Sequence, residues 1–102
     1  MKTQITPSSG NVFRDLGFST EEAEHLRIRS ALMLSVQDVL RGLRMSQRQA
    51  AKLLGVTQPR VCDLLRGRID LFSTDTLIDL LTRMGGTVKL LVKKPSKKRH
   101  IA

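Results

Sequence analysis

Polar side chains suited to directional hydrogen bonding gather in the segment from Gln47 to Arg66. Gln58 has an amide that donates and accepts at once, Arg60 has a planar guanidinium, and Asp63 has a carboxylate. These groups match base edges in the major groove of DNA, where glutamine pairs with adenine, arginine with guanine, and a carboxylate accepts from cytosine. Arg60 could instead bind a phosphate, the commoner contact, and Asp63 could instead hold Arg60 or Arg66 in place. The chemistry expected here is therefore recognition of a duplex.

Two short helices joined by a tight turn are predicted to position these side chains. Ser46 is a favourable N-cap for the first helix, which runs through Leu53 or Leu54. Gly55 ends that helix because glycine readily adopts the positive φ that the turn requires. Ala51, one helical turn before the glycine, is small enough to let the two helices cross closely.

The second helix of the pair is predicted from Gln58 to Leu65, and Gly67 ends it. Thr57 is its N-cap, and a proline in its first turn is well tolerated. At about 100° per residue, Val61 and Leu64 share one side of the helix and should anchor it in the core, while Val56 fills the turn. The other side carries Pro59, Cys62, Asp63 and Arg66, with Gln58 and Arg60 at its flanks.

Two longer helices are predicted on either side of this pair. The first begins at Ser19, which has capping-box spacing to Glu22, and ends near Arg41 with Gly42 as its stop. Its apolar residues recur at steps of three and four and predict a buried stripe of Ile28, Leu32, Val36, Val39, Leu40 and Leu43. The last helix, from Asp75 to Met84, is capped by Ser73 or Thr74 and ended by two glycines.

The segment from Thr87 to Lys93 is predicted to be a β-strand, because it is rich in β-branched residues and because Val88, Leu90 and Val92 alternate along it. A single strand leaves its backbone groups without partners. Pairing with the same strand of a second copy solves this, so we expect a homodimer joined through Val88, Leu90 and Val92. The predicted organisation is a flexible lead-in over residues 1–11, one domain over residues 12–94 and a basic tail over residues 95–102.

The composition narrows the class of partner. The chain has 102 residues and a net charge of +9, of which residues 46–72 carry +3 and residues 73–102 carry +5. Such an excess favours a polyanionic partner, either nucleic acid or an acidic membrane surface. With three Phe and no Trp or Tyr, the chain lacks the aromatic platforms on which single-stranded bases stack. Cys62 is the only cysteine, which excludes an internal disulfide and favours a reducing, cytoplasmic setting. We expect no membrane span, metal, cofactor or catalytic residue.

The motif resembles the λ-repressor-like (Xre) helix-turn-helix family in five residues at fixed offsets. They are a small residue, a glycine, an apolar residue that fills the turn and two apolar anchors: Ala51, Gly55, Val56, Val61 and Leu64. The resemblance implies an all-α bundle of five helices whose second motif helix enters the major groove of double-stranded DNA. The chain further resembles HigA-type antitoxins, which are encoded beside a ribonuclease toxin. This narrower resemblance lies in residues 55–67, in the apolar knot from Asn11 to Phe18 and in the closing strand.

In this family the amino-terminal turn of the second motif helix faces the bases, which favours Gln58 and Pro59 as base contacts. A glutamine at the start of the preceding helix, here Gln47, can brace the base-reading residue. The residues expected to read bases are therefore Gln47, Gln58, Pro59, Arg60 and Asp63. The residues expected to contact phosphates are Ser46, Arg66, Arg68, Ser73 and Thr74. Cys62 lies on the same side as the readers, as either a redox switch or a small residue beneath the DNA backbone.

The expected function is repression at a near-palindromic operator read by a homodimer, with neutralisation of a small ribonuclease toxin as the antitoxin role. The knot from Val12 to Phe18 and the helix that follows it are the candidate toxin contacts, unless the knot packs into the core. Two alternatives stay open at this point. One is a stand-alone Xre-type regulator without a toxin, and the other is an interaction module of the same fold that does not read DNA.

Overall fold

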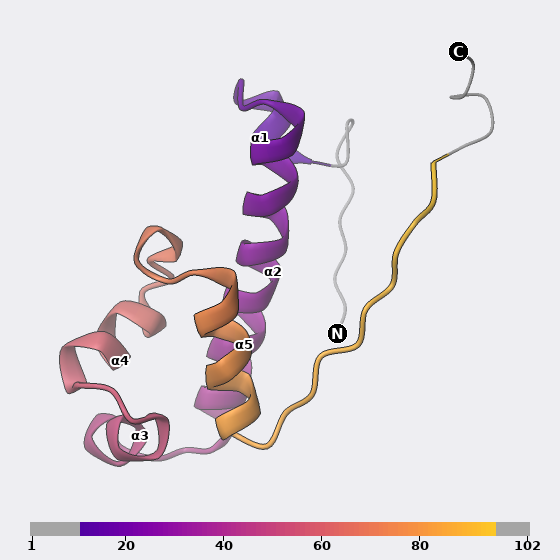
Figure 1. Cartoon of the computed structure of the whole chain (residues 1–102). Helices are drawn as coiled ribbons and strands as arrows, with labels where there is room; N and C mark the ends of the chain where they lie inside the picture. The colour runs from indigo at the N-terminus through magenta and orange to yellow at the C-terminus, as the bar shows by residue number, and fades with distance from the viewer. Residues whose placement is uncertain (1–10, 96–102) are drawn as a thin grey trace.

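The structure is a computed structural model that describes residues 11–95. The described chain is all-helical, as predicted, with five α-helices and one 3-10 helix (Figure 1). In chain order the elements are α1 (Val12–Asp15), α2 (Thr20–Gly42), α3 (Gln47–Leu54), α4 (Gln58–Leu65), η1 (Ile69–Leu71) and α5 (Thr74–Arg83).

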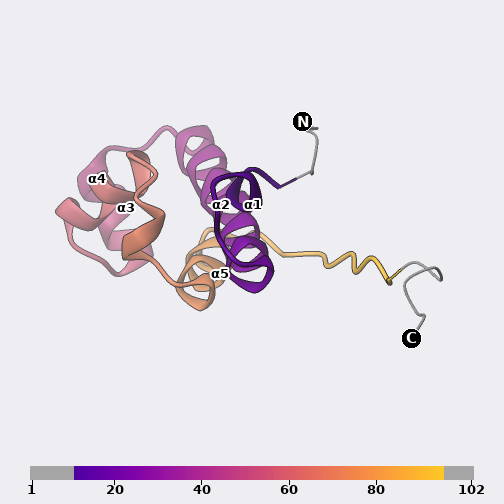
Figure 2. The same cartoon turned by 90° about the horizontal axis from the view of Figure 1, so that it is seen from above.

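Helix α2 is the central element of the bundle. It packs most extensively against α5 and also against α1, α4 and η1 (Figure 2). Leu32, Val36 and Leu40 from the predicted stripe are buried, whereas Ile28 and Leu43 are exposed. The 23 residues of α2 span about 35 Å, more than twice the length of α5, so its ends project past the helices that cover its middle. The other buried apolar side chains of the core are Met33, Ala50, Ala51, Leu54, Val61, Leu64, Phe72, Leu77, Leu80 and Leu81.

Local capping chemistry determines where the helices begin. In each of four helices the N-cap side chain accepts a hydrogen bond from the backbone N–H three residues further on, which satisfies a donor that the helix leaves free. The four caps are Ser19, Ser46, Thr57 and Ser73, as predicted. Of the two long helices, α2 extends one residue beyond the predicted end, through Gly42, and α5 ends one residue early, at Arg83.

Gly42 is not the stop of α2, contrary to the prediction. It is the last helical residue, and the left-handed conformation occurs two residues later at Arg44, with φ of 52°. Leu43 N–H donates to the carbonyl of Val39 at 3.1 Å, so the helical hydrogen bonding continues past the glycine. A non-glycine residue at positive φ carries a conformational cost that the tertiary packing of the connection to α3 must offset.

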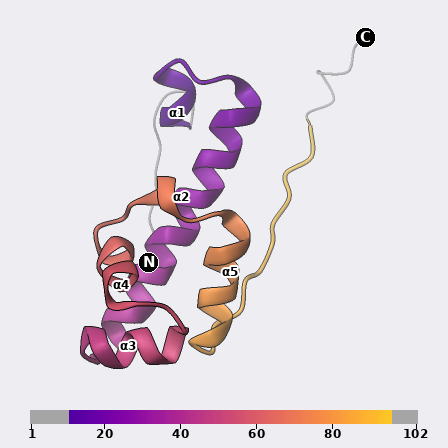
Figure 3. The same ribbon diagram turned by 60° about the vertical axis from the view of Figure 1, so that its left-hand side comes forward.

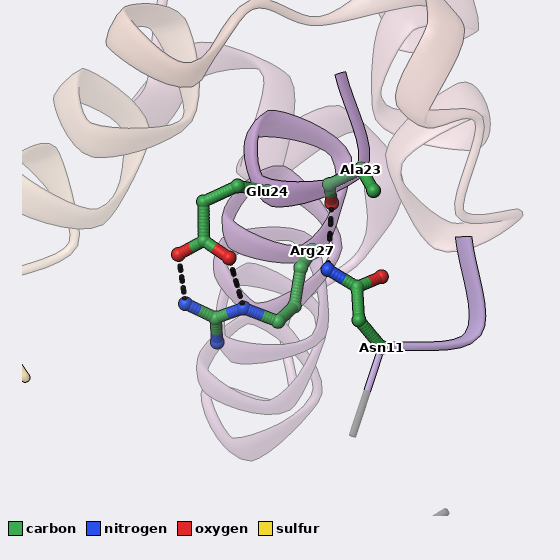
Figure 4. Close-up of polar contacts among 4 residues, drawn as sticks. All are labelled: Asn11, Ala23, Glu24 and Arg27. Atoms are coloured by element: carbon green, nitrogen blue, oxygen red, sulfur yellow. Dashed lines mark hydrogen bonds and ion pairs between the residues drawn. The ribbon is translucent and has the colours of Figure 1, made fainter. Parts of the chain in front are cut away.

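The apolar knot near the amino terminus contains α1 and packs on α2, at the end of α2 that is remote from α3 and α4 (Figure 3). Asn11, which we assigned to the lead-in, is buried, caps α1 and donates from Nδ2 to the carbonyl of Ala23 at 3.1 Å (Figure 4). On the adjacent turn of α2, Arg27 pairs with Glu24 at 2.6 Å, and this hydrogen bond lowers the pKa of Glu24 (Figure 4).

The segment after α5 is extended but is not a strand, so the strand predicted from Thr87 to Lys93 is not confirmed. Residues 87–95 leave the end of α5 as an irregular chain, and a groove lies between this chain and α2 (Figures 1 and 2). A strand requires a neighbour that shares its backbone hydrogen bonds, and the described part of this single chain provides none beside the segment. The predicted lead-in before Asn11 and the basic tail after Pro95 lie outside the described residues.

Candidate DNA-binding surface

Helices α3 and α4 form a helix-turn-helix whose turn spans three residues. Gly55 adopts the left-handed conformation with φ of 70°, as predicted. Val56 N–H closes the end of α3 by donating to the carbonyl of Ala51 at 3.0 Å. Ala51 is buried in the core, and the half-buried Val56 packs against the core. These local contacts fix the direction in which α4 leaves the turn.

The two faces of α4 differ sharply in exposure. Val61 and Leu64 have no accessible surface, so they hold the inner face of the helix to the core as predicted. Gln58 and Pro59 in the first turn are exposed. Because the helix is anchored along its inner face, the amino-terminal turn is presented to solvent at the end of the bundle formed by α3 and α4 (Figure 3).

Arg60 is half-buried and is held by the junction between η1 and α5. Its guanidinium lies 4.0 Å from the centre of the Phe72 ring, and its Nη1 donates to the carbonyl of Leu71 at 3.2 Å. A cation over an aromatic face and a backbone acceptor together restrict the side chain. Arg60 therefore ties α4 to the segment that follows it, and the guanidinium nitrogens not bonded to Leu71 remain to meet a ligand.

Asp63 does not hold Arg60 or Arg66 in place, which is one of the two roles predicted for it. No ion pair joins Asp63 to Arg60 or Arg66 within residues 11–95, whereas Arg68 pairs with Asp70 at 3.2 Å. The hydrogen bond between the two lowers the pKa of Asp70 and raises that of Arg68. Both side chains are open to solvent, so a phosphate could compete with Asp70 for Arg68.

The predicted serine contacts are already used as helix caps. Ser46 and Gln49 form a reciprocal capping box, in which Ser46 Oγ accepts from the Gln49 N–H at 3.1 Å and Gln49 Oε1 accepts from the Ser46 N–H at 2.9 Å. Ser73 Oγ accepts from the N–H of Thr76 at 3.1 Å. A hydroxyl that accepts in this way keeps its own proton, and Ser73, whose Oγ also lies 2.9 Å from Thr76 Oγ1, keeps its proton for a ligand when Thr76 is the donor of that bond. Gln47 is exposed in the first turn of α3, and the half-buried Thr74 opens α5.

Comparison with known proteins agrees with this geometry. A family model described as a helix-turn-helix domain matches residues 12–93. A solved structure of a protein assigned to the XRE family of transcriptional regulators is 30% identical, with a TM-score of 0.68, over 79% of this chain and 91% of the other. The chain belongs to the XRE-type helix-turn-helix family. No curated protein sequence matches it. Neither match specifies a HigA-type antitoxin, so that narrower resemblance stays a prediction.

Membership of the XRE-type family makes this protein a DNA-binding transcriptional regulator. No helix in residues 11–95 has the length and apolar character needed to cross a bilayer. Across the same residues, no three His, Cys, Asp or Glu side chains come together in a way that could hold a metal ion. Cys62, on the side of α4 that carries the predicted readers, is half-buried.

Two residues that sequence reasoning missed contact the motif from outside it. Gln37 of α2 donates from Nε2 to the carbonyl of Leu64 at 2.9 Å, near the end of α4. Arg83 of α5 donates from Nη1 to the carbonyl of Leu54 at 3.0 Å, at the end of α3. A polar amide next to the apolar stripe of α2 was a readable sign for Gln37, because buried amides need partners. Nothing local distinguished Arg83 from any basic residue in a last helical turn.

Proposed function

We propose that this XRE-type protein regulates transcription by reading a specific sequence in the major groove with the first turn of α4. The observation that carries the proposal is the orientation of α4, with Gln58 exposed and Val61 and Leu64 fully buried on the opposite face. Helices of this motif enter the groove with their amino-terminal residues against the bases. In the bidentate pairing with adenine, the exposed amide of Gln58 donates from Nε2 to N7, and its Oε1 accepts from the N6 amino group.

The other predicted readers take supporting roles in this proposal. Gln47 braces Gln58 from the first turn of α3, and Pro59 contacts a thymine methyl group. Asp63, which has no ion-pair partner among the described residues, accepts from cytosine N4. Arg60 binds a phosphate or guanine with the part of its guanidinium that Leu71 leaves free, its direction set by Phe72.

The phosphate contacts set the register of the protein on the duplex. Arg66 is exposed at the end of α4 and forms no ion pair among the described residues, so it meets the backbone directly. Arg68 does so by exchanging Asp70 for a phosphate. The hydroxyls of Ser46 and Ser73 donate to phosphate oxygens while they cap their helices, and Thr74 adds a backbone N–H at the start of α5.

Selection of bound duplexes from a random library tests the base readout. The wild-type protein should enrich one motif, and Gln58→Ala should lose the adenine preference at one position of each half-site, at a cost of about 1–3 kcal/mol. Arg66→Ala is the matched control, because a lost phosphate contact weakens all duplexes alike and reduces the salt slope by about one. A wild-type protein that enriches no motif would contradict the proposal.

The second part of the proposal is a homodimer formed through the segment after α5. Leu90, Leu91 and Val92 are 79–98% exposed in the single chain, and a run of exposed apolar residues of this kind marks a surface that binds a partner. A groove of about 720 Å³ lies between this segment and α2, where Ile28 and Ala31 line it. We propose that the same segment of a second copy pairs with Val88, Leu90 and Val92 as a strand. Ultracentrifugation that finds a stable monomer at micromolar concentration would refute the dimer.

The third part is an antitoxin role. The knot is not packed into the core, because Val12, Leu16 and Phe18 are all exposed, 44–70% by fraction. It also lies at the end of α2 remote from the proposed readers, so a protein bound there would leave α4 free (Figure 1). This arrangement favours a protein partner at the knot, as expected for a ribonuclease toxin. Co-expression with the product of the adjacent gene tests the role, and an absent complex leaves the stand-alone regulator.

A further inference from the structure

We propose that Arg83 and Gln37 are positioning residues for DNA recognition, each holding the carboxyl end of one motif helix. Neither belongs to the motif, since Arg83 ends α5 and Gln37 lies within α2. The inference rests on the proposed function, because positioning matters only if α4 reads a sequence. It assigns to two residues outside the reading surface a role in the selectivity of that surface.

Arg83 caps α3 at the point where the chain bends toward the reader. The last carbonyls of an α-helix have no partner within the helix, and the carbonyl of Leu54 instead accepts from Arg83 Nη1 at 3.0 Å. A guanidinium there also complements the negative end of the helix dipole and forms a charge-assisted bond. Since Leu54 precedes Gln58 by only four residues, a change in this contact alters the exit direction of the turn.

Gln37 has the same relation to α4. Its amide is buried, and its Nε2 donates to the carbonyls of Leu64 and Leu65 at 2.9 and 3.3 Å. These are the last two residues of the helix. The amide therefore fastens the carboxyl end of α4 to the central helix, and the amino-terminal turn of α4 is left outward.

The glycines that end the two motif helices lie beneath these same side chains. A Cβ at Gly55 would lie 2.5 Å from Arg83 Nη1, and a Cβ at Gly67 would lie 3.1 Å from Gln37 Nε2. Both glycines have positive φ, 70° and 73°. Each glycine thus serves the turn and also leaves room for the cap. The same arrangement at two separate helix ends indicates that these caps restrict the orientation of both motif helices.

Such a constraint should affect selectivity more than general attraction to DNA. Base readout requires the reading groups to be held within about 0.5 Å of the productive geometry. Phosphate contacts by long, flexible arginines tolerate larger errors. Loosening either cap should therefore lower binding to the preferred duplex and leave binding to unrelated duplexes nearly unchanged.

The test compares Arg83→Met and Gln37→Met with the wild type on the selected duplex and on an unrelated one, over a range of salt. Arg83→Lys restores one charged donor, and Arg14→Met is the matched charge control, because Arg14 is exposed on α1. Circular dichroism at the assay temperature confirms that each variant is folded. If one Met variant does not fold, the affinity ratios of the other Met variant and of Arg83→Lys still test the proposal.

We expect the ratio of preferred to unrelated affinity to fall roughly tenfold in each Met variant, the scale of one lost hydrogen bond to a charged or buried group. The salt slopes should stay parallel to the wild type, Arg83→Lys should recover part of the ratio, and Arg14→Met should leave it unchanged. An unchanged ratio would overturn the proposal, and so would a slope reduced by about one, which signals direct phosphate contact. A wild type without any preference would refute the proposed function itself.

Discussion

Replacing Gly55 by alanine tests how the turn of the motif is stabilised. The substitution adds a Cβ to a residue at φ of 70°, 2.5 Å from Arg83 Nη1. The arginine tip can move, but moving it breaks the 3.0 Å hydrogen bond to the carbonyl of Leu54. The cost thus has two separable parts, one in the backbone of the turn and one in the cap.

The two parts can be estimated from the structure. A left-handed conformation costs a residue with a Cβ roughly 1–2 kcal/mol. Loss of the Arg83 cap adds about 1 kcal/mol, less than the roughly 1.5–3 kcal/mol of a buried bond to a charged group, because the side chain is partly exposed to solvent. We therefore expect Gly55→Ala to lower the free energy of unfolding by about 2–3 kcal/mol.

Urea unfolding of a double-mutant cycle separates the parts. In an Arg83→Met background the cap is already absent, so Gly55→Ala should cost only the backbone part, and the coupling should be about 1 kcal/mol. Gly17→Ala is the control, because Gly17 also has positive φ but its added Cβ would meet nothing within 4 Å. Its cost should be equal in both backgrounds. A coupling near zero for Gly55 would refute the account of the cap.

Three further predictions concern the core, the exposed ion pair and the dimer. Leu64→Ala should lower the free energy of unfolding by about 2–5 kcal/mol, because it empties a fully buried site beneath α4, and thermal or urea unfolding measures this. Arg68→Met should raise the pKa of Asp70 toward its ordinary value, which an NMR titration measures. Because the pair lowers that pKa in the folded protein, the pair stabilises the fold at neutral pH, and this stabilisation is lost as the pH falls through the lowered pKa. Leu90→Lys should yield a monomer in ultracentrifugation while the stability of the single chain changes by less than about 0.5 kcal/mol, because the side chain is 85% exposed.

Local chemistry explains which parts of the fold the sequence predicts. The caps at Ser46 and Thr57 and the left-handed Gly55 depend on neighbours a few residues away, and the structure confirms all three. The anchors Val61 and Leu64 follow from helical periodicity within one short segment, and they are buried. These features fix the motif, so the orientation of the candidate readers could be predicted.

The remaining features depend on contacts between distant segments. Gln37 and Arg83 reach carbonyls 27 and 29 residues away, and no local pattern predicts such partners. The stack of Arg60 on Phe72 likewise appears only once η1 has turned the chain back toward α4. Gly42 failed as a stop because the helical hydrogen bonding continues to Leu43 and the left-handed residue is Arg44, which no local pattern marks. The strand after α5 was inferred from β-branched composition and alternation, and neither supplies a pairing partner.

The central claim is that the first turn of α4 enters the groove of a duplex, and amide chemical-shift mapping tests it most directly. An isotopically labelled protein is titrated with the selected duplex and, as a control, with an unrelated one. We predict that the largest changes with the selected duplex fall on the amides of Thr57, Gln58 and Arg60, with smaller changes at Arg66, Arg68 and the start of α5. Changes centred on α1 or α2, with these three amides unmoved, would contradict the account.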